Sequence, residues 1–204
     1  MSLRLRGRWK QGGRERSLED LATAAASNAW RAACNGVLNL ENEGFETTSR
    51  AQRLDIIEEF VAFLVLVADR VAYERLDDDE RGRFITAMAL RLSGLVDENR
   101  SDAQGPGQYR EQFIDKLNER TGLYAECSYS EQEGPGFSML CVLGDRVTDV
   151  LGPTNRKWAQ DQVVAIDGPE AAQAFTRALK SLLGAAAASG PRAGDGPTRP
   201  LADD

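Results

Sequence analysis

The stretch that decides the fold is residues 56–73, which read IIEEFVAFLVLVADRVAY. Its large apolar side chains recur at alternating spacings of three and four residues, the repeat of one face of an α-helix. Val61, Phe63 and Val65 widen this apolar surface well beyond a single stripe. A helix that is apolar on most sides is typical of the centre of a bundle. We therefore predict a central helix at about residues 48–76.

The apolar run within this helix is too short to cross a membrane. From Phe60 to Ala68 it holds nine residues, against the roughly 20 of a spanning helix. The basic start of the chain leads to Gln11 and Gly12 rather than to an apolar segment, so it does not resemble a signal peptide. The three cysteines are odd in number and form no C-x-x-C pair, which is typical of a reducing compartment. We predict a soluble, cytoplasmic protein.

Further helices are predicted on both sides of the central one. The preceding helix begins at Ser17 and ends near Leu40, and the following one begins at the acidic run 77–80. Later segments are separated by glycine–proline pairs, because glycine ends a helix well and proline begins one well. The pairs are Gly105–Pro106, Gly134–Pro135, Gly152–Pro153 and Gly168–Pro169. Five later helices are predicted, each from an apolar stripe. The stripes are, in chain order, Ile85, Met88, Leu92 and Leu95; Tyr109, Phe113 and Leu117; Leu140, Leu143, Val147 and Val150; Trp158, Ala165 and Ile166; and Phe175, Ala178, Leu179 and Leu182. The second of these helices is expected to end at Gly122, and Asp167 and Glu170 are expected to cap the last.

Together these segments predict an all-α fold, a compact bundle of about six to seven helices around the central one, with disordered termini. The chain divides into a mobile basic arm (1–16), a helical domain (17–184) and a disordered tail rich in alanine, glycine and proline (185–204). Residues 123–129 fit either a frayed helix or a short extended segment. Period-two alternation occurs nowhere else, so no proper sheet is predicted.

Charge is distributed unevenly along the chain. The whole sequence carries −7, whereas residues 1–16 hold six basic residues and one acid, a net +5 that leaves −12 for the rest. An acidic body argues against nucleic-acid binding by the helical domain. The arm could bind an anionic membrane surface peripherally, bind a nucleic acid, fold onto a partner, or remain a solvated tail beside the acidic body. Its candidate contact residues are Arg4, Arg6, Arg8, Trp9 and Lys10.

The absence of histidine removes most catalytic systems. It excludes Ser-His-Asp and Cys-His nucleophiles, H-E-x-x-H zinc sites and the Glu-x-x-His pairs of di-iron bundles. Neither the phosphate-binding loop nor the glycine-rich dinucleotide motif is present. We therefore expect a protein that is not an enzyme and that uses no cofactor.

Carboxylates of the central helix are the remaining candidates for chemistry. Four fall roughly on one side of it: Asp55, Glu58, Glu59 and Asp69. Facing the interior, they could hold Mg2+ or Mn2+ or act as acid and base. Charge runs usually face water, so the favoured interpretation is a solvated side, or one paired with arginines, Arg53 and Arg70 being near in sequence.

Cysteine and aromatic side chains are predicted to serve packing. Cys34 and Cys141 lie among apolar neighbours, and Cys127 follows Glu126, whose charge disfavours a reactive thiolate. The aromatics expected mostly on core stripes are Trp30, Phe60, Phe63, Phe84, Phe113, Phe137, Trp158 and Phe175.

Three functions remain open after these exclusions. The first is a non-catalytic helical interaction or adaptor protein with a protein partner, because the core is well patterned while catalytic motifs are missing. The second is a bundle that binds a small molecule or lipid in a cavity lined by the apolar central helix. The third, ranked last, is a carboxylate-based Mg2+ or Mn2+ enzyme.

Overall fold

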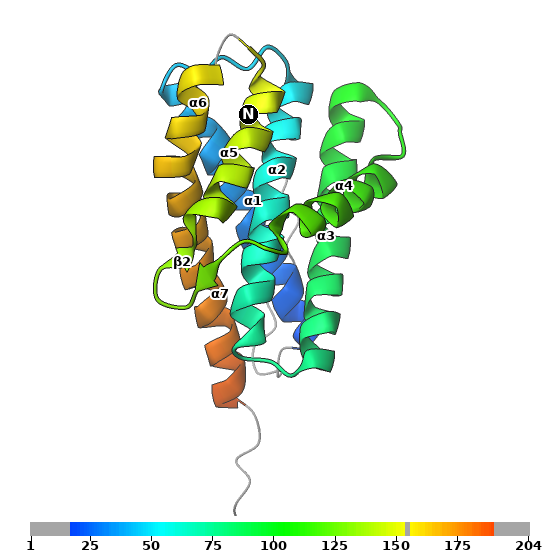
Figure 1. Ribbon diagram of the computed structural model, residues 1–204. Helices are drawn as coiled ribbons and strands as arrows, with labels where there is room; N and C mark the ends of the chain where they lie inside the picture. Colours follow the sequence, from blue (N-terminus) through cyan, green and yellow to red (C-terminus); the bar gives the residue numbers. More distant parts are fainter. Residues whose placement is uncertain (1–16, 154–155, 190–204) are drawn as a thin grey trace, which may run out of the picture.

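The computed structural model describes residues 17–153 and 156–189. It is an all-α bundle with one short hairpin, as Figure 1 shows, which confirms the predicted fold class. The helices are α1 (Leu18–Asn42), α2 (Arg50–Tyr73), α3 (Asp78–Gln104), α4 (Tyr109–Tyr124), α5 (Phe137–Leu151), α6 (Arg156–Gln162) and α7 (Gly168–Ser189), with a π-helical turn, η1 (Val163–Asp167), between the last two. Strands β1 (Tyr129–Ser130) and β2 (Gly134–Pro135) pair antiparallel.

Helix α2 is the centre of the bundle, as its sequence predicts. It contacts α1, α3, α4, α5 and α7, and every residue from Ile56 to Ala68 is buried. The side-chain hydroxyl of Ser49 accepts a hydrogen bond from the Gln52 backbone N–H and so caps the first turn. The helix is shorter than the predicted 48–76 by two residues at its start and three at its end.

Helix α1 lies close to α2 because it presents small residues to the core. Ala22, Ala25, Ala26 and Ala29 are fully buried, each without a long side chain to hold the helices apart. At Gly36 an added Cβ would lie 2.9 Å from Cζ of Phe60, so only glycine permits this approach without displacing the ring.

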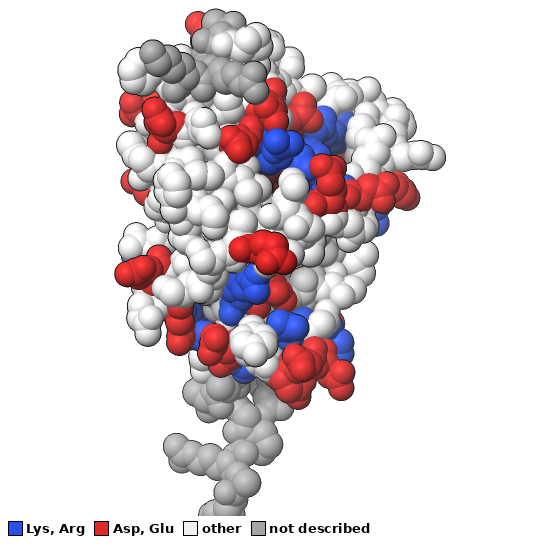
Figure 2. All heavy atoms as spheres, viewed as in Figure 1, with Lys and Arg blue, Asp and Glu red and all other residues white. Residues whose placement is uncertain are grey.

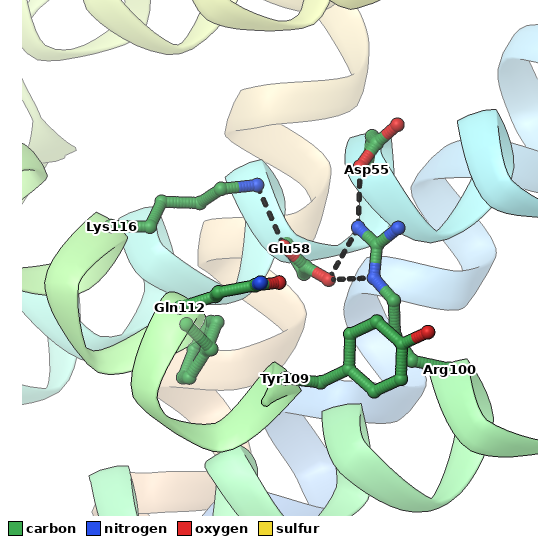
Figure 3. Close-up of a pocket in the computed structure, with 7 residues that line it drawn as sticks. Asp55, Glu58, Arg100, Tyr109, Gln112 and Lys116 are labelled. Carbon is green, nitrogen blue, oxygen red and sulfur yellow. Dashed lines mark hydrogen bonds and ion pairs between the residues drawn. The ribbon is translucent and has the colours of Figure 1, made fainter. Parts of the chain in front are cut away.

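Helices α3 and α4 are joined by a tight turn that positions the candidate site. Gly105 ends α3 with a φ of 86°, a left-handed conformation that a side chain would strain. The chain reverses over four residues, and α4 packs against both α3 and α2. The C-terminal part of α3 and the middle of α4 are thereby brought beside the first half of α2, as Figure 3 shows.

Two predicted helix ends are wrong. Helix α4 continues past Gly122 to Tyr124, whose side chain is buried. Helix α7 continues to Ser189, five residues into the segment that the sequence assigns to the tail.

Residues 125–128 form a turn and irregular backbone before β1, so residues 123–129 begin helical and end extended. Residues 1–16 and 190–204 lie outside the described part of the chain.

The predicted break between the last two helices is also wrong. Gly168–Pro169 lies within a continuous helical stretch, because the turn before it widens into a π-helix. Proline lacks an N–H and crowds the carbonyl four residues earlier, and a widened turn accommodates both defects. The N–H of Gly168 donates instead to Val163, five residues back. Asp167 therefore ends a π-turn and does not cap a helix.

Two expected core aromatics and one expected core isoleucine lie on the surface. Phe137 is 74% exposed and Trp158 is 68% exposed, while Ile166 is 44% exposed. Helix α6 and its π-turn bury Ala159 and Val163 instead. No helix in the described part of the chain is long and apolar enough to cross a membrane.

Candidate functional site

The candidate site begins with three acids on the first half of α2. Glu58 and Glu59 are 4% and 3% exposed, whereas the side chain of Asp55 is 40% exposed. Helices α3 and α4 pack on α2 at this level and supply the side chains that bind both glutamates. The expectation of a solvated acidic side is therefore wrong for Glu58 and Glu59. A buried carboxylate needs a charged or hydrogen-bonding partner.

Arg100 of α3 and Lys116 of α4 supply the partners of Glu58. Oε1 accepts from Nε of Arg100 at 2.7 Å and lies 2.6 Å from its Nη2. Oε2 accepts from Nζ of Lys116 at 2.6 Å. The same Nη2 of Arg100 also binds Oδ1 of Asp55. Figure 3 shows Lys116 and Arg100 reaching Glu58 from opposite sides.

Arg120 of α4 binds Glu59 through two parallel hydrogen bonds. Its Nε lies 2.7 Å from Oε2 and its Nη2 lies 2.9 Å from Oε1. This planar two-point geometry is the strong form of an ion pair. Nζ of Lys116 lies 3.7 Å from Glu59, and Nη1 of Arg120 also pairs with Glu119 at 2.7 Å. All oxygens of the two buried glutamates are therefore hydrogen-bonded.

The two arginines of the cluster, Arg100 and Arg120, are held in their charged forms. The hydrogen bonds that Arg120 donates to Glu59 raise the pKa of Arg120 above its ordinary value, although burial opposes the charge. For Arg100, burial is the largest influence and lowers the pKa, but Asp55 and Glu58 together outweigh it and raise the pKa. The cluster is thus a set of fixed opposite charges that joins α4 to α2 and α3.

A hollow of about 250 Å3 opens over this cluster between α2, α3 and α4. Figure 3 shows the amide of Gln112 and the ring of Tyr109 beside the Glu58 carboxylate and the Arg100 guanidinium. The lining residues are Asp55, Glu58, Arg100, Tyr109, Gln112, Phe113 and Lys116. Its walls are mainly polar, whereas the apolar middle of α2 is buried against other helices.

The four candidate metal ligands form no metal-binding group: Asp55, Glu58 and Glu59 lie together but are bound by basic side chains, and Asp69 lies apart from them. Asp69 lies toward the other end of α2, where its carboxylate is 3.8 Å from Arg81. Within residues 17–153 and 156–189 no group of three or more cysteine, aspartate or glutamate side chains is arranged to hold a metal ion. The expected pairing with arginines is confirmed, but the arginines differ: Arg53 pairs with Glu41, and Arg70 binds the backbone of Ala125.

Asp167 is a further buried acid, outside this cluster, which the sequence assigns only to a helix cap. It is 1% exposed, and neither carboxylate oxygen accepts a hydrogen bond from any described residue. Burial raises the pKa of its carboxyl from 3.8 to about 6. Glu170 and Glu43 add to this rise in pKa, while the amides of Asn39 and Gln162 oppose it without reversing it.

The three cysteines have different surroundings. Cys34 is buried, as expected, and burial raises the pKa of its thiol to about 11. Cys127 and Cys141 are half-buried, so the expectation of a core position is wrong for Cys141. Burial also raises the pKa of the Cys141 thiol, with smaller contributions from Asp145 and Cys127.

No protein-family model, curated protein or solved structure matches this chain. The candidate residues of the basic arm, Arg4, Arg6, Arg8, Trp9 and Lys10, lie outside the described residues.

Proposed function

We propose that this chain is a non-catalytic interaction protein that binds a protein partner through the surface of α5 and α6. The observation that carries the proposal is the exposure of two large aromatic side chains, Phe137 at 74% on α5 and Trp158 at 68% on α6. Tryptophan and phenylalanine are normally well buried, and both are enriched at the centres of protein interfaces. Exposed large aromatics on two neighbouring helices are therefore candidate anchors for a partner.

The two helices form a firm support for these side chains. At Gly144 an added Cβ would lie 2.7 Å from Cγ2 of Val164, so α5 and the helical segment after Trp158 approach closely. The amide of Gln160 donates to Oδ1 of Asp145 at 2.7 Å and ties α6 to α5. Anchors on rigid elements lose little conformational entropy on binding, which favours affinity.

Charge around this surface defines the chemistry of the partner. Figure 2 shows a largely uncharged band across α5, with acidic groups above and below it. Exposed acids on the two helices include Asp145, Asp149 and Asp161. The whole chain carries −7. We expect a partner segment with an apolar centre and flanking lysine or arginine residues, because complementary charge speeds association and fixes orientation.

The test compares variants of the full chain in affinity capture from a native lysate. We expect Phe137→Ser/Trp158→Ser to lose a stoichiometric partner that the unmodified chain retains, with affinity reduced roughly tenfold or more, the effect of removing interface anchors. The matched control is Leu90→Ser on α3, a side chain that is 60% exposed. It should leave capture unchanged. Equal capture by the double variant, or no partner for the unmodified chain, would contradict the proposal.

The hollow over Glu58 supports a second candidate function, binding of a small polar molecule. Tyr109, Gln112 and Lys116 place a hydroxyl, an amide and an ammonium group around about 250 Å3. This volume is slightly below the usual range for drug-sized ligands and suits a compact polar one. Its polar walls do not favour a lipid. Native mass spectrometry of the full chain should then show a retained small molecule that Gln112→Leu loses and Leu90→Ser keeps.

Contact between the basic arm and an anionic surface remains a separate proposal. The full chain with Arg4, Arg6, Arg8 and Lys10 changed to glutamine should bind vesicles containing phosphatidylserine more weakly than the unmodified chain. Each basic residue near such a surface contributes about 1 kcal/mol. Equal binding by the two chains would show that the arm is not a membrane contact. Binding of the same two chains to duplex DNA tests the nucleic-acid alternative.

A further inference from the structure

Cys127 and Cys141 lie on the two sides of the junction between the β1–β2 hairpin and α5. Both are half-buried free cysteines. Cys127 follows the end of α4 in irregular backbone, and its Sγ lies 3.7 Å from the carbonyl oxygen of Leu123. Cys141 is the fifth residue of α5.

The hairpin register places Cys127 opposite the first residue of α5. Tyr129 pairs with Pro135 and Ser130 with Gly134. The antiparallel pairing continues outward, because the N–H of Gly136 donates to the carbonyl of Ser128 at 2.8 Å. The next positions along the two segments in this register are Cys127 and Phe137, the first residue of α5.

Helix geometry then brings Cys141 toward the same place. It lies four residues after Phe137, about one helical turn along the same side of α5. Side chains on a helix lean toward its N-terminus, so the thiol of Cys141 leans back toward the hairpin base. A hydrogen bond from the Ser128 N–H to Oγ of Ser138, at 3.4 Å, holds the two segments together between the cysteines.

We propose that Cys127 and Cys141 form a reversible intramolecular disulfide that fastens the end of α4 to α5. The oxidant is a low-molecular-weight disulfide such as oxidised glutathione. The Cys127 thiolate attacks one of its sulfurs, forms a mixed disulfide and releases one glutathione thiolate. The Cys141 thiolate then attacks the Cys127 sulfur and releases the second. Both cysteine protons are lost, one protein S–S bond forms, and oxidised glutathione is reduced to two thiols.

The surroundings of Cys141 influence the step that closes the ring. Burial raises the pKa of its thiol, so the attacking thiolate forms less readily at neutral pH. The rate of closure should rise as the pH is raised from about 7 to 9. The short irregular segment at residues 125–128 can adjust to the geometry that a disulfide requires, with Cα atoms about 4.4–6.8 Å apart.

The disulfide should also affect partner binding at Phe137, an expectation that rests on the proposed function. Phe137 lies between the two cysteines in this arrangement, so the disulfide would fix the backbone on both sides of an interface anchor. Oxidation should then change partner affinity, whereas disulfide formation itself does not depend on any partner. If no partner binds at Phe137, the disulfide can still be tested. If no disulfide forms, partner binding can still be tested.

The experiment treats the folded full chain with excess oxidised glutathione, blocks free thiols and maps peptides by mass spectrometry without reduction. We expect a peptide pair joined through Cys127 and Cys141, with a mass about 2 Da below that of the two free thiols. Cys34→Ser should give the same pair, because Cys34 is buried and takes no part. Cys127→Ser and Cys141→Ser should each give no joined pair, and Cys141→Ser should accumulate glutathione on Cys127.

Circular dichroism before and after oxidation shows that the chain remains folded. Glutathione retained on both Cys127 and Cys141 without a joined peptide would overturn the proposal. So would two free thiols after prolonged treatment at about pH 9, or a crosslink that involves Cys34.

Discussion

Glu59 and Asp167 are both buried carboxylic acids in the same bundle, 3% and 1% exposed, but their surroundings differ. Arg120 binds both oxygens of Glu59 at 2.7 and 2.9 Å. Neither oxygen of Asp167 accepts a hydrogen bond from the described residues. Arg120 compensates Glu59 for the loss of water, whereas burial raises the pKa of Asp167, which therefore holds its proton more tightly. Burial alone therefore does not decide how an acid is accommodated, and we expect removal of one charge to have opposite effects at the two sites.

The largest effect is expected from breaking the Glu59 pair on its cationic side. Arg120→Met leaves a buried carboxylate with only Lys116 nearby, at 3.7 Å. Removing one member of a buried ion pair typically lowers the free energy of unfolding by about 3–5 kcal/mol. Urea unfolding at neutral pH, followed by circular dichroism, measures this change.

The control removes both charges together. Glu59→Met/Arg120→Met replaces the ion pair by apolar side chains of similar size, which is often close to neutral for stability. We expect the double variant to recover most of the loss. If the single variant lowers the free energy of unfolding by less than about 1 kcal/mol, the pair does not stabilise the contact of α4 with α2 as we infer.

Removing the charge of Asp167 should instead stabilise the protein. The native pKa of about 6 exceeds the ordinary 3.8, so the folded state binds this proton more tightly than the unfolded state. The contribution of Asp167 to stability therefore falls as the pH rises through this window, and its full cost is present above about pH 6. We expect Asp167→Asn to raise the free energy of unfolding by about 1–3 kcal/mol at about pH 7.5.

The pH dependence distinguishes this explanation from a general effect of the substitution. The gain should fall to about a third at pH 4.5, because the native carboxyl is then mostly protonated. Glu59→Gln, a matched acid-to-amide change at the paired site, should destabilise the protein at pH 7.5. An Asp167→Asn gain that is equal at both pH values would show that charge is not its cause.

The sequence predicts α2 well because its information is local. The apolar repeat from Ile56 onward identifies a buried helix without knowledge of any partner. The same reasoning could have indicated the burial of Glu58 and Glu59, since apolar residues directly precede and follow this pair on a helix that is apolar on most sides. We predicted a solvated or arginine-paired side instead, because runs of charged residues usually lie in water and because the charged partners are remote in the sequence.

Those partners depend on the tertiary fold. Arg100, Lys116 and Arg120 lie 42, 58 and 61 residues from the glutamates they bind. Their meeting requires the turn at Gly105 and the packing of α4, neither of which has a signal in α2. The π-turn before Pro169 is similar, because a glycine–proline pair predicts a helix boundary until tertiary packing supports a widened turn.

The smallest effect is expected at the exposed edge of the paired cluster. Asp55 shares Arg100 with Glu58, and its side chain is 40% exposed, so water replaces much of what the ion pair contributes. We expect Asp55→Asn to lower the free energy of unfolding by no more than about 1 kcal/mol. Salt at about 1 M should reduce even this difference, because it screens exposed charges more strongly than buried ones. Urea unfolding at low and high salt, with Arg120→Met as the buried comparison, measures both effects. A loss for Asp55→Asn as large as that for Arg120→Met would contradict this expectation. It would mean that the contribution of an ion pair in this cluster does not depend on its exposure to solvent, and that Arg100 depends on Asp55 as much as on Glu58.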